Sequence, residues 1–222
     1  MSSVTRPALL IAAHGTASTP GLATTRAIAA AVASRLPGVA VSLCFLDVAT
    51  PSLASALEMI NGPVVVVPLV LSSGYHVRTD IPAVVAGRAD VRVTPHLGPA
   101  PALADVLAAR LREAASGRQA ASTAMVAIGS SREEARAEVA AMAALLGERV
   151  GRPVHVVPLF GDVRGALSDL PQPVEVAAYL LAEGTFSRSL DEAVEGLGWV
   201  AAPIGADPAV ADLVVDRFQS HP

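Results

Sequence analysis

The sequence predicts an α/β protein that contains the same parallel-sheet fold twice. Apolar, β-branched segments, typical of strands buried on both faces, alternate with segments that have helical spacing. The alternation stops at residues 116–122, which have the composition of a linker, and then begins again. Alternating strands and helices favour a parallel sheet covered by helices, so we expect one such sheet in each half.

In the first half, each of four strands precedes a helix. The predicted strands are residues 9–13, 39–46, 63–71 and 91–94, and the predicted helices are residues 22–36, 53–60, 81–86 and 101–115. Pro37 and Gly38 end the first helix. Asp80 is interpreted as the N-cap of helix 81–86, with Pro82 in the first turn, where its missing N–H costs nothing.

The second half repeats this order in a slightly shortened form. Its predicted strands are residues 124–128, 153–160 and 174–181, and its predicted helices are residues 132–150 and 209–218. The turn glycines align between the halves, as Gly15 with Gly129 and Gly74 with Gly184. A fold copied in this way places the domains at residues 1–117 and 122–222.

Two histidines of the first half follow buried strands. His14 comes directly after strand 9–13, and His76 lies in the polar segment after strand 63–71. In open α/β sheets, ligands bind at the carboxyl ends of the strands, so we expect the two imidazoles to converge. Imidazole binds divalent metals and transfers protons near neutral pH, which predicts a catalytic metal site.

The second half lacks this chemistry. Ile128 stands at the position of His14, and Phe186 stands at the position of His76. The fold was therefore repeated without the histidines, which indicates that they serve a function rather than the fold. The alternative is that each is a loop histidine bonded to nearby backbone.

A carboxylate at a third strand end is a further candidate. Asp47 closes strand 39–46 and would complete a metal site of two histidines and one carboxylate, with open positions. Alternatively, Asp47 makes a local Asx-turn, because Asp162 holds the matching position in the half without histidines. Both interpretations stay open.

Other polar residues beside the predicted site are candidates for binding substrate. Arg78 either pairs with an anionic substrate or is a solvated charge. Asp80 has a second possible role at the site besides capping. The remaining candidates are the hydroxyl residues Thr16, Ser72 and Ser73, which also suit helix capping, and Gly74, which is interpreted as architectural.

Composition excludes several classes of protein. The net charge is −4, and all 16 basic residues are scattered arginines, so we expect no nucleic-acid partner. The single cysteine, Cys44, excludes an internal disulfide and lies in an apolar strand as a buried, inert thiol. No apolar run approaches the ~20 residues of a membrane helix, so we expect a cytoplasmic protein without a membrane partner. Phosphate-loop, dinucleotide-binding, nucleophile-elbow and zincin motifs are missing from the sequence.

Taken together and in order, four segments resemble the sirohydrochlorin chelatase family, the cofactor-independent class II tetrapyrrole chelatases. The segments are Leu10-Ile11-Ala12-Ala13-His14-Gly15-Thr16, Phe45-Leu46-Asp47-Val48-Ala49-Thr50-Pro51-Ser52-Leu53, residues 66–71 with Gly74-Tyr75-His76-Val77-Arg78-Thr79-Asp80-Ile81-Pro82, and Leu97-Gly98-Pro99. They cover the first half densely, and the repeat covers the second half more faintly.

The resemblance implies two doubly wound, chelatase-like α/β domains facing each other across a cleft. It implies insertion of Co²⁺, Fe²⁺ or Ni²⁺ into sirohydrochlorin, with release of two protons, in siroheme or cobalamin biosynthesis. His14 and His76 fall on the metal-binding, proton-accepting histidines of the family. Asp47 stands where many members have glutamate, so its reach is shorter. The implied partners are the polycarboxylate sirohydrochlorin and the substrate metal, with no other cofactor. Two joined halves favour a monomer.

Three other classes of protein fit some of these features. A metallochaperone module would bind Co²⁺ or Ni²⁺ at the same histidines without affinity for a tetrapyrrole. A histidine phosphatase would need an arginine beside its nucleophilic histidine, but Ala13 occupies that position. A regulatory α/β domain, whose second half supports a dimer, would not need polar site residues in one half alone.

Overall fold

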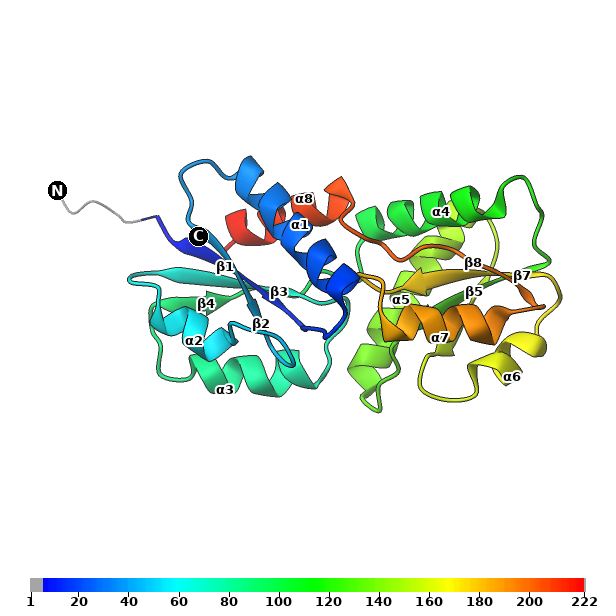
Figure 1. Ribbon diagram of the computed structural model, residues 1–222, viewed down its shortest axis with the longest axis horizontal. Helices are drawn as coiled ribbons and strands as arrows, with labels where there is room; N and C mark the ends of the chain where they lie inside the picture. Colours follow the sequence, from blue (N-terminus) through cyan, green and yellow to red (C-terminus); the bar gives the residue numbers. More distant parts are fainter. Residues whose placement is uncertain (1–5, 222) are drawn as a thin grey trace. The chain divides into compact units, whose positions relative to one another are not determined.

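The computed structural model describes residues 6–221 and divides into two compact units (Figure 1). The first unit comprises the chain up to Leu97 together with the segment that begins at Pro208, and the second unit comprises Gly98–Asp207. Each unit contains one four-stranded sheet in which all strand pairs are parallel. The predicted α/β class and the duplicated parallel sheet are confirmed.

The first unit has four strands, with helices on both faces. The strands are β1 (Ala8–Ala13), β2 (Val41–Phe45), β3 (Val64–Leu69) and β4 (Val91–Val93), and the helices are α1 (Thr19–Arg35), α2 (Leu53–Glu58), the π-helix η1 (His76–Asp80), α3 (Ile81–Val85) and α8 (Pro208–Gln219). Figure 1 shows α1 and α8 on one face of this sheet and α2 and α3 on the other. Because both faces are covered, all of β3 is buried, which explains its uninterrupted apolar sequence.

The strand order places the predicted site at a point where the chain direction switches. The order is β2-β1-β3-β4, so the chain leaves β1 toward one edge of the sheet and leaves β3 toward the other. Such a switch opens a crevice beyond the carboxyl ends of the two strands. Ala13 and Leu69 pair at these ends, so both strands stop at the same level.

The second unit has the same topology, with strand order β6-β5-β7-β8. Its strands are β5 (Ser122–Ala127), β6 (Val154–Pro158), β7 (Val174–Tyr179) and β8 (Gly198–Val200), and its helices are α4 (Pro101–Ala115), α5 (Glu133–Val150), α6 (Val163–Ser168) and α7 (Thr185–Val194). The helices α6 and α7 and the strand β8 were not among the predicted elements. Ala127 pairs with Tyr179, so β5 and β7 also end at one level.

The compact units do not follow the sequence repeat at the last helix of each half. Helix α4 ends the first half of the sequence but packs on α5 and β7 of the second unit. Helix α8 ends the second half but packs on α1 and β3 of the first unit. The division into 1–117 and 122–222 thus describes the repeat, whereas the units exchange these helices. An apolar helix stripe indicates that the helix is covered, but not by which sheet.

Helix α1 begins earlier than the sequence pattern predicts. It starts at Thr19 rather than at Leu22, because the Ser18 hydroxyl accepts a hydrogen bond from the Gly21 N–H at 3.4 Å. Within residues 6–221, no helix combines the length and the apolar character needed to cross a membrane.

Candidate functional site

The two predicted site histidines lie against each other at the carboxyl edge of the first sheet. The ring centroids of His14 and His76 are 4.6 Å apart, and the ring planes meet at 86°. His14 follows β1 directly and is exposed, whereas the His76 side chain is 24% exposed. The switch point between β1 and β3 thus brings together two imidazoles that are 62 positions apart in the sequence.

His76 lies on a π-helical turn, where the sequence predicted an irregular loop. The turn η1 runs from His76 to Asp80, and the N–H of Ile81 donates to the carbonyl oxygen of His76. Single π-helical turns occur frequently at functional sites, because the wide turn displaces side chains from regular helical spacing. Helix α3 continues from η1 without a break.

Asp80 contacts His76 and does not cap α3. Its Oδ2 lies 2.6 Å from Nδ1 of His76, and its side chain makes no capping bond. The N-cap interpretation is therefore wrong: the Asp80 backbone is helical, with φ −72° and ψ −48°, whereas a capping residue is extended. When the carboxylate accepts from Nδ1–H, Nε2 of His76 carries the free lone pair.

Gly15 allows the loop after β2 to lie directly against the residue that carries His14. The Asp47 N–H donates to the carbonyl oxygen of His14 at 2.9 Å. Gly15 has φ +98°, and a Cβ atom there would overlap the carbonyl oxygen of Asp47. Glycine is required here for both reasons, and the contact fixes the backbone beneath His14.

The Asp47 carboxylate bonds to its own loop. Its Oδ1 accepts from the Val48 N–H at 2.8 Å, and the residue is exposed. Within residues 6–221, no group of three or more His, Cys, Asp or Glu side chains is arranged to hold a metal ion. This bond reaches only the next residue, whereas an Asx-turn reaches two residues on. Neither sequence interpretation of Asp47 is therefore confirmed, and its role as a metal ligand stays a prediction.

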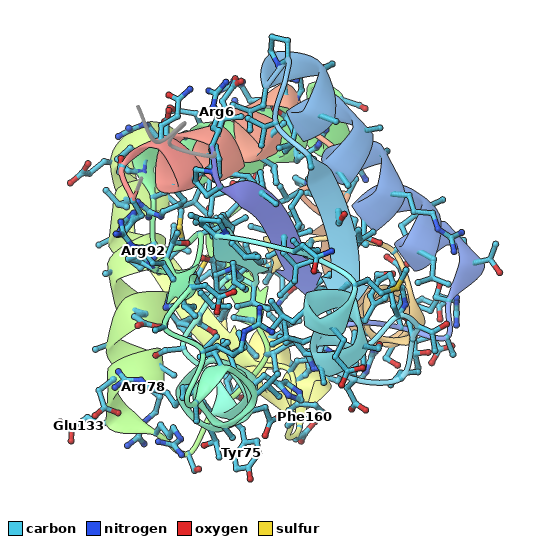
Figure 2. All side chains as sticks on the ribbon, turned by 90° about the vertical axis from the view of Figure 1, so that its left-hand side faces the viewer. Arg6, Tyr75, Arg78, Arg92, Glu133 and Phe160 are labelled. Carbon is cyan, nitrogen blue, oxygen red and sulfur yellow. The ribbon has the colours of Figure 1, made fainter. Side chains whose placement is uncertain are left out.

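Two exposed apolar residues beside the histidines were missed by sequence reasoning. Tyr75 is 60% exposed, projects away from the ribbon (Figure 2), and has its ring 6.3 Å from that of His76. Val48 is 65% exposed and has φ +59°, a strained conformation for a β-branched residue. Val48 lies in the loop between β2 and α2, and neither its exposure nor its backbone conformation follows from the local sequence pattern.

The substrate-binding candidates differ in environment. Arg78 is exposed (Figure 2), and its guanidinium has no ion-pair or hydrogen-bond partner within the described residues 6–221. The Thr16 hydroxyl accepts from the Ser18 N–H at 3.0 Å. Ser73 is buried, and Ser72 is partly buried. Thr16 therefore serves its own loop, while Arg78 retains an unused positive charge.

Gly74 is not required by the fold at its position. Its φ lies outside the left-handed region, and a Cβ atom there would meet nothing within 4 Å. The architectural interpretation of Gly74 is therefore wrong for the described structure. Recurrence of a glycine in the repeat does not by itself indicate a backbone requirement.

Comparisons with known proteins agree with this arrangement. The sequence model of the CbiX family matches residues 8–114, and no curated protein matches the chain. The sirohydrochlorin chelatase SirB from Bacillus subtilis subspecies spizizenii, solved in complex with cobalt, is 18% identical, with TM-score 0.80 over 97% of this chain and 94% of that one. SirB from Bacillus subtilis with Fe³⁺ is 21% identical, with TM-score 0.79 over 97% and 95% of the two chains. CbiX, described as the terminal enzyme for biosynthesis of siroheme in denitrifying bacteria, is 25% identical, with TM-score 0.73 over 97% and 99%.

Two parallel sheets of this order form a chelatase-like fold, and in this chain paired histidines lie at the switch point of the first sheet. The resemblance to the sirohydrochlorin chelatase family is confirmed, by sequence over residues 8–114 and by fold over nearly the whole chain. For the second half the likeness is one of fold alone.

Proposed function

We propose that this protein inserts a divalent metal ion, Co²⁺ or Fe²⁺, into sirohydrochlorin during siroheme or cobalamin biosynthesis. The observation that carries the proposal is the His14–His76 pair, with ring centroids 4.6 Å apart at the switch point of the first sheet. The SirB structures with cobalt and Fe³⁺ support a metal as substrate. The proposal includes a monomeric, cytoplasmic enzyme.

The histidine pair suits a metal that must be released to a second ligand. Imidazole nitrogens bind Co²⁺ and Fe²⁺ less tightly than thiolates would, and the few protein ligands leave positions open for water and substrate nitrogens. Asp80 holds the Nδ1 side of His76, so Nε2 is the atom available to the metal. The four ring nitrogens then replace the protein ligands around the ion.

The same imidazoles are suited to accept protons. Insertion of M²⁺ displaces two N–H protons of the macrocycle, so the charge on the complex is unchanged and two H⁺ leave. His14 is exposed and can pass a proton to solvent, while Asp80 holds the His76 ring through the contact with its Nδ1. The histidine that is not bound to the metal ion at that step accepts the proton from the macrocycle.

The substrate's shape and charge match the rim of the site. Sirohydrochlorin is a flat polycarboxylate, and Arg78 offers an unpaired planar guanidinium within η1, two residues after His76. Tyr75 offers an exposed ring beside His76. We assign Arg78 to a substrate carboxylate and Tyr75 to the macrocycle face.

The test is an anaerobic insertion assay followed by absorbance. Sirohydrochlorin is mixed with Co²⁺, Fe²⁺ or Ni²⁺ in turn, with and without the protein. We expect faster formation of the metallated product with at least one of the metals. Equal rates with and without protein for all three metals would refute the proposal.

A metallochaperone is the second candidate function, because the histidine pair alone would serve either role. Titration of the metal-free protein with sirohydrochlorin distinguishes the two. A saturable shift of the tetrapyrrole absorbance supports the chelatase, and Co²⁺ binding without any such shift supports the metallochaperone.

A further inference from the structure

The second sheet carries apolar side chains at the edge where the first sheet carries histidines. Ile128 follows β5, Phe160 follows β6, and Phe186 lies in the first turn of α7 after β7. These three side chains are 40%, 60% and 41% exposed. Exposed apolar side chains gathered at one place on a surface commonly mark a binding site.

Two of these residues form an aromatic pair. The ring centroids of Phe160 and Phe186 are 5.6 Å apart, and the planes meet at 90°. The fold itself does not require an exposed ring at this edge, because Asp47 holds the position of Phe160 in the first unit: each lies two residues after the residue that pairs with the end of the central strand, Phe45 with Ala13 and Pro158 with Ala127. The aromatic pair therefore belongs to the chemistry of this unit and not to the shared scaffold.

A cavity of about 550 Å³ adjoins the pair, within the usual size of small-molecule sites. Its walls come from the β5–α5 loop, the start of α5 and the end of β6. The residues that matter here are Ile128, Ser131, Arg136, Val139 and Phe160. The lining is thus mainly apolar, with one guanidinium and hydroxyl groups that can orient a ligand.

Arg136 gives this cavity its charge preference. The residue is exposed, and its guanidinium has no ion-pair or hydrogen-bond partner in the part of the chain that the structure describes. A planar guanidinium binds a carboxylate through two parallel hydrogen bonds. Apolar rings beside an unpaired arginine suit a flat ligand that carries carboxylates.

We propose that this edge of the second unit is a subsite for a carboxylate-bearing tetrapyrrole, with the ring face on Phe160 and Phe186 and a carboxylate on Arg136. The inference rests on the proposed function and deepens it by assigning a substrate-binding role to the half without histidines. Ile128 and Phe186 stand in this unit where the first unit has its two histidines. The second unit therefore lacks the metal ligands and has apolar surface in their place, so it binds the ring without binding metal.

The test is a titration of the full-length protein with metal-free sirohydrochlorin, followed by absorbance. The variants are Phe160→Ala, Phe186→Ala and Arg136→Gln. The controls are Met59→Ala, which removes an 81% exposed side chain after α2, and Arg112→Gln, which removes an exposed arginine of α4. Circular dichroism and Co²⁺ binding are measured for each variant.

We expect each phenylalanine variant to weaken tetrapyrrole binding about fivefold and Arg136→Gln about threefold. Folding, Co²⁺ affinity and both control variants should remain at wild-type values. If wild-type protein binds sirohydrochlorin and all three variants bind equally well, the subsite is refuted while the proposed function stands. If wild-type protein itself does not bind sirohydrochlorin, the proposed function fails with it.

Discussion

Oδ2 of Asp80 lies 2.6 Å from Nδ1 of His76, across one turn of the π-helix that follows β3. This contact orients the imidazole ring and leaves Nε2 as its free nitrogen. Carboxylate–histidine pairs of this kind orient metal-ligating histidines and raise their basicity. We therefore regard Asp80 as a positioning residue that acts through His76.

Replacing Asp80 by asparagine should lower both Co²⁺ affinity and insertion rate about 10- to 100-fold. The neutral amide is a weaker hydrogen-bond acceptor than the carboxylate and holds the His76 ring less firmly. Co²⁺ affinity is read by calorimetry, and insertion by absorbance. Asp169→Asn is the matched control, since Asp169 is an exposed aspartate of the second unit. Asp80→Glu should recover part of the Co²⁺ affinity. Unchanged affinity in Asp80→Asn would remove Asp80 from the site.

Gly15→Ala should destabilise the protein by about 3 kcal/mol, because the new Cβ atom would overlap the Asp47 carbonyl oxygen and the φ of +98° is unfavourable for alanine. Gly62→Ala separates the two causes, since Gly62 has φ +94° with nothing within 4 Å. We expect a loss of about 1 kcal/mol at Gly62. The free energy of unfolding in urea measures both. Equal losses would mean that the Asp47 contact contributes nothing.

Asp47→Ala should reduce the insertion rate less than about 10-fold, because its carboxylate bonds to the Val48 N–H and forms no three-ligand group with the histidines. Asp47→Asn keeps an oxygen acceptor for that N–H and should remain close to wild type. The assay is metal insertion at saturating Co²⁺. A loss in Asp47→Ala as large as that of a histidine variant would instead make Asp47 a metal ligand.

Burial raises the pKa of the Cys44 thiol to about 12. Since the thiolate is the reactive form, Cys44 should not react with Ellman's reagent at pH 8 in the folded protein and should react once the protein is unfolded in guanidinium. The folded pKa lies above the unfolded value of 9.0, so the neutral thiol's contribution to stability is complete below pH 9 and is lost as the pH rises toward 12. Fast labelling of the native protein would contradict this burial.

Much of the fold could be predicted from the sequence, because the apolar runs of strands and the helical spacing of apolar residues are both local patterns. Buried parallel strands are uninterrupted apolar runs, and β3 is the clearest example. The meeting of His14 and His76 followed from their positions at two strand ends, since the carboxyl ends of parallel strands share one edge.

What could not be predicted depends on contacts distant in sequence or on small changes of backbone. The exchange of α4 and α8 between units leaves no pattern, because both helices need only an apolar face. The sequence predicted Asp80 as a helix cap, but the backbone of η1 is helical at this residue. The Asp80 side chain therefore contacts His76 instead of the N-terminus of α3. Phe160 lies at the position of Asp47 and not of Phe45, because Pro158 pairs with Ala127 as Phe45 pairs with Ala13, and matching the two phenylalanines by sequence misses this.

The most direct test of the central claim compares His14→Ala and His76→Ala with His155→Ala in the insertion assay. His155 is an exposed histidine of β6 in the second unit and serves as the matched control. We expect the first two variants to lose about 100-fold or more of the insertion rate with unchanged circular dichroism, and His155→Ala to match wild type. Wild-type insertion rates in both His14→Ala and His76→Ala would contradict the account.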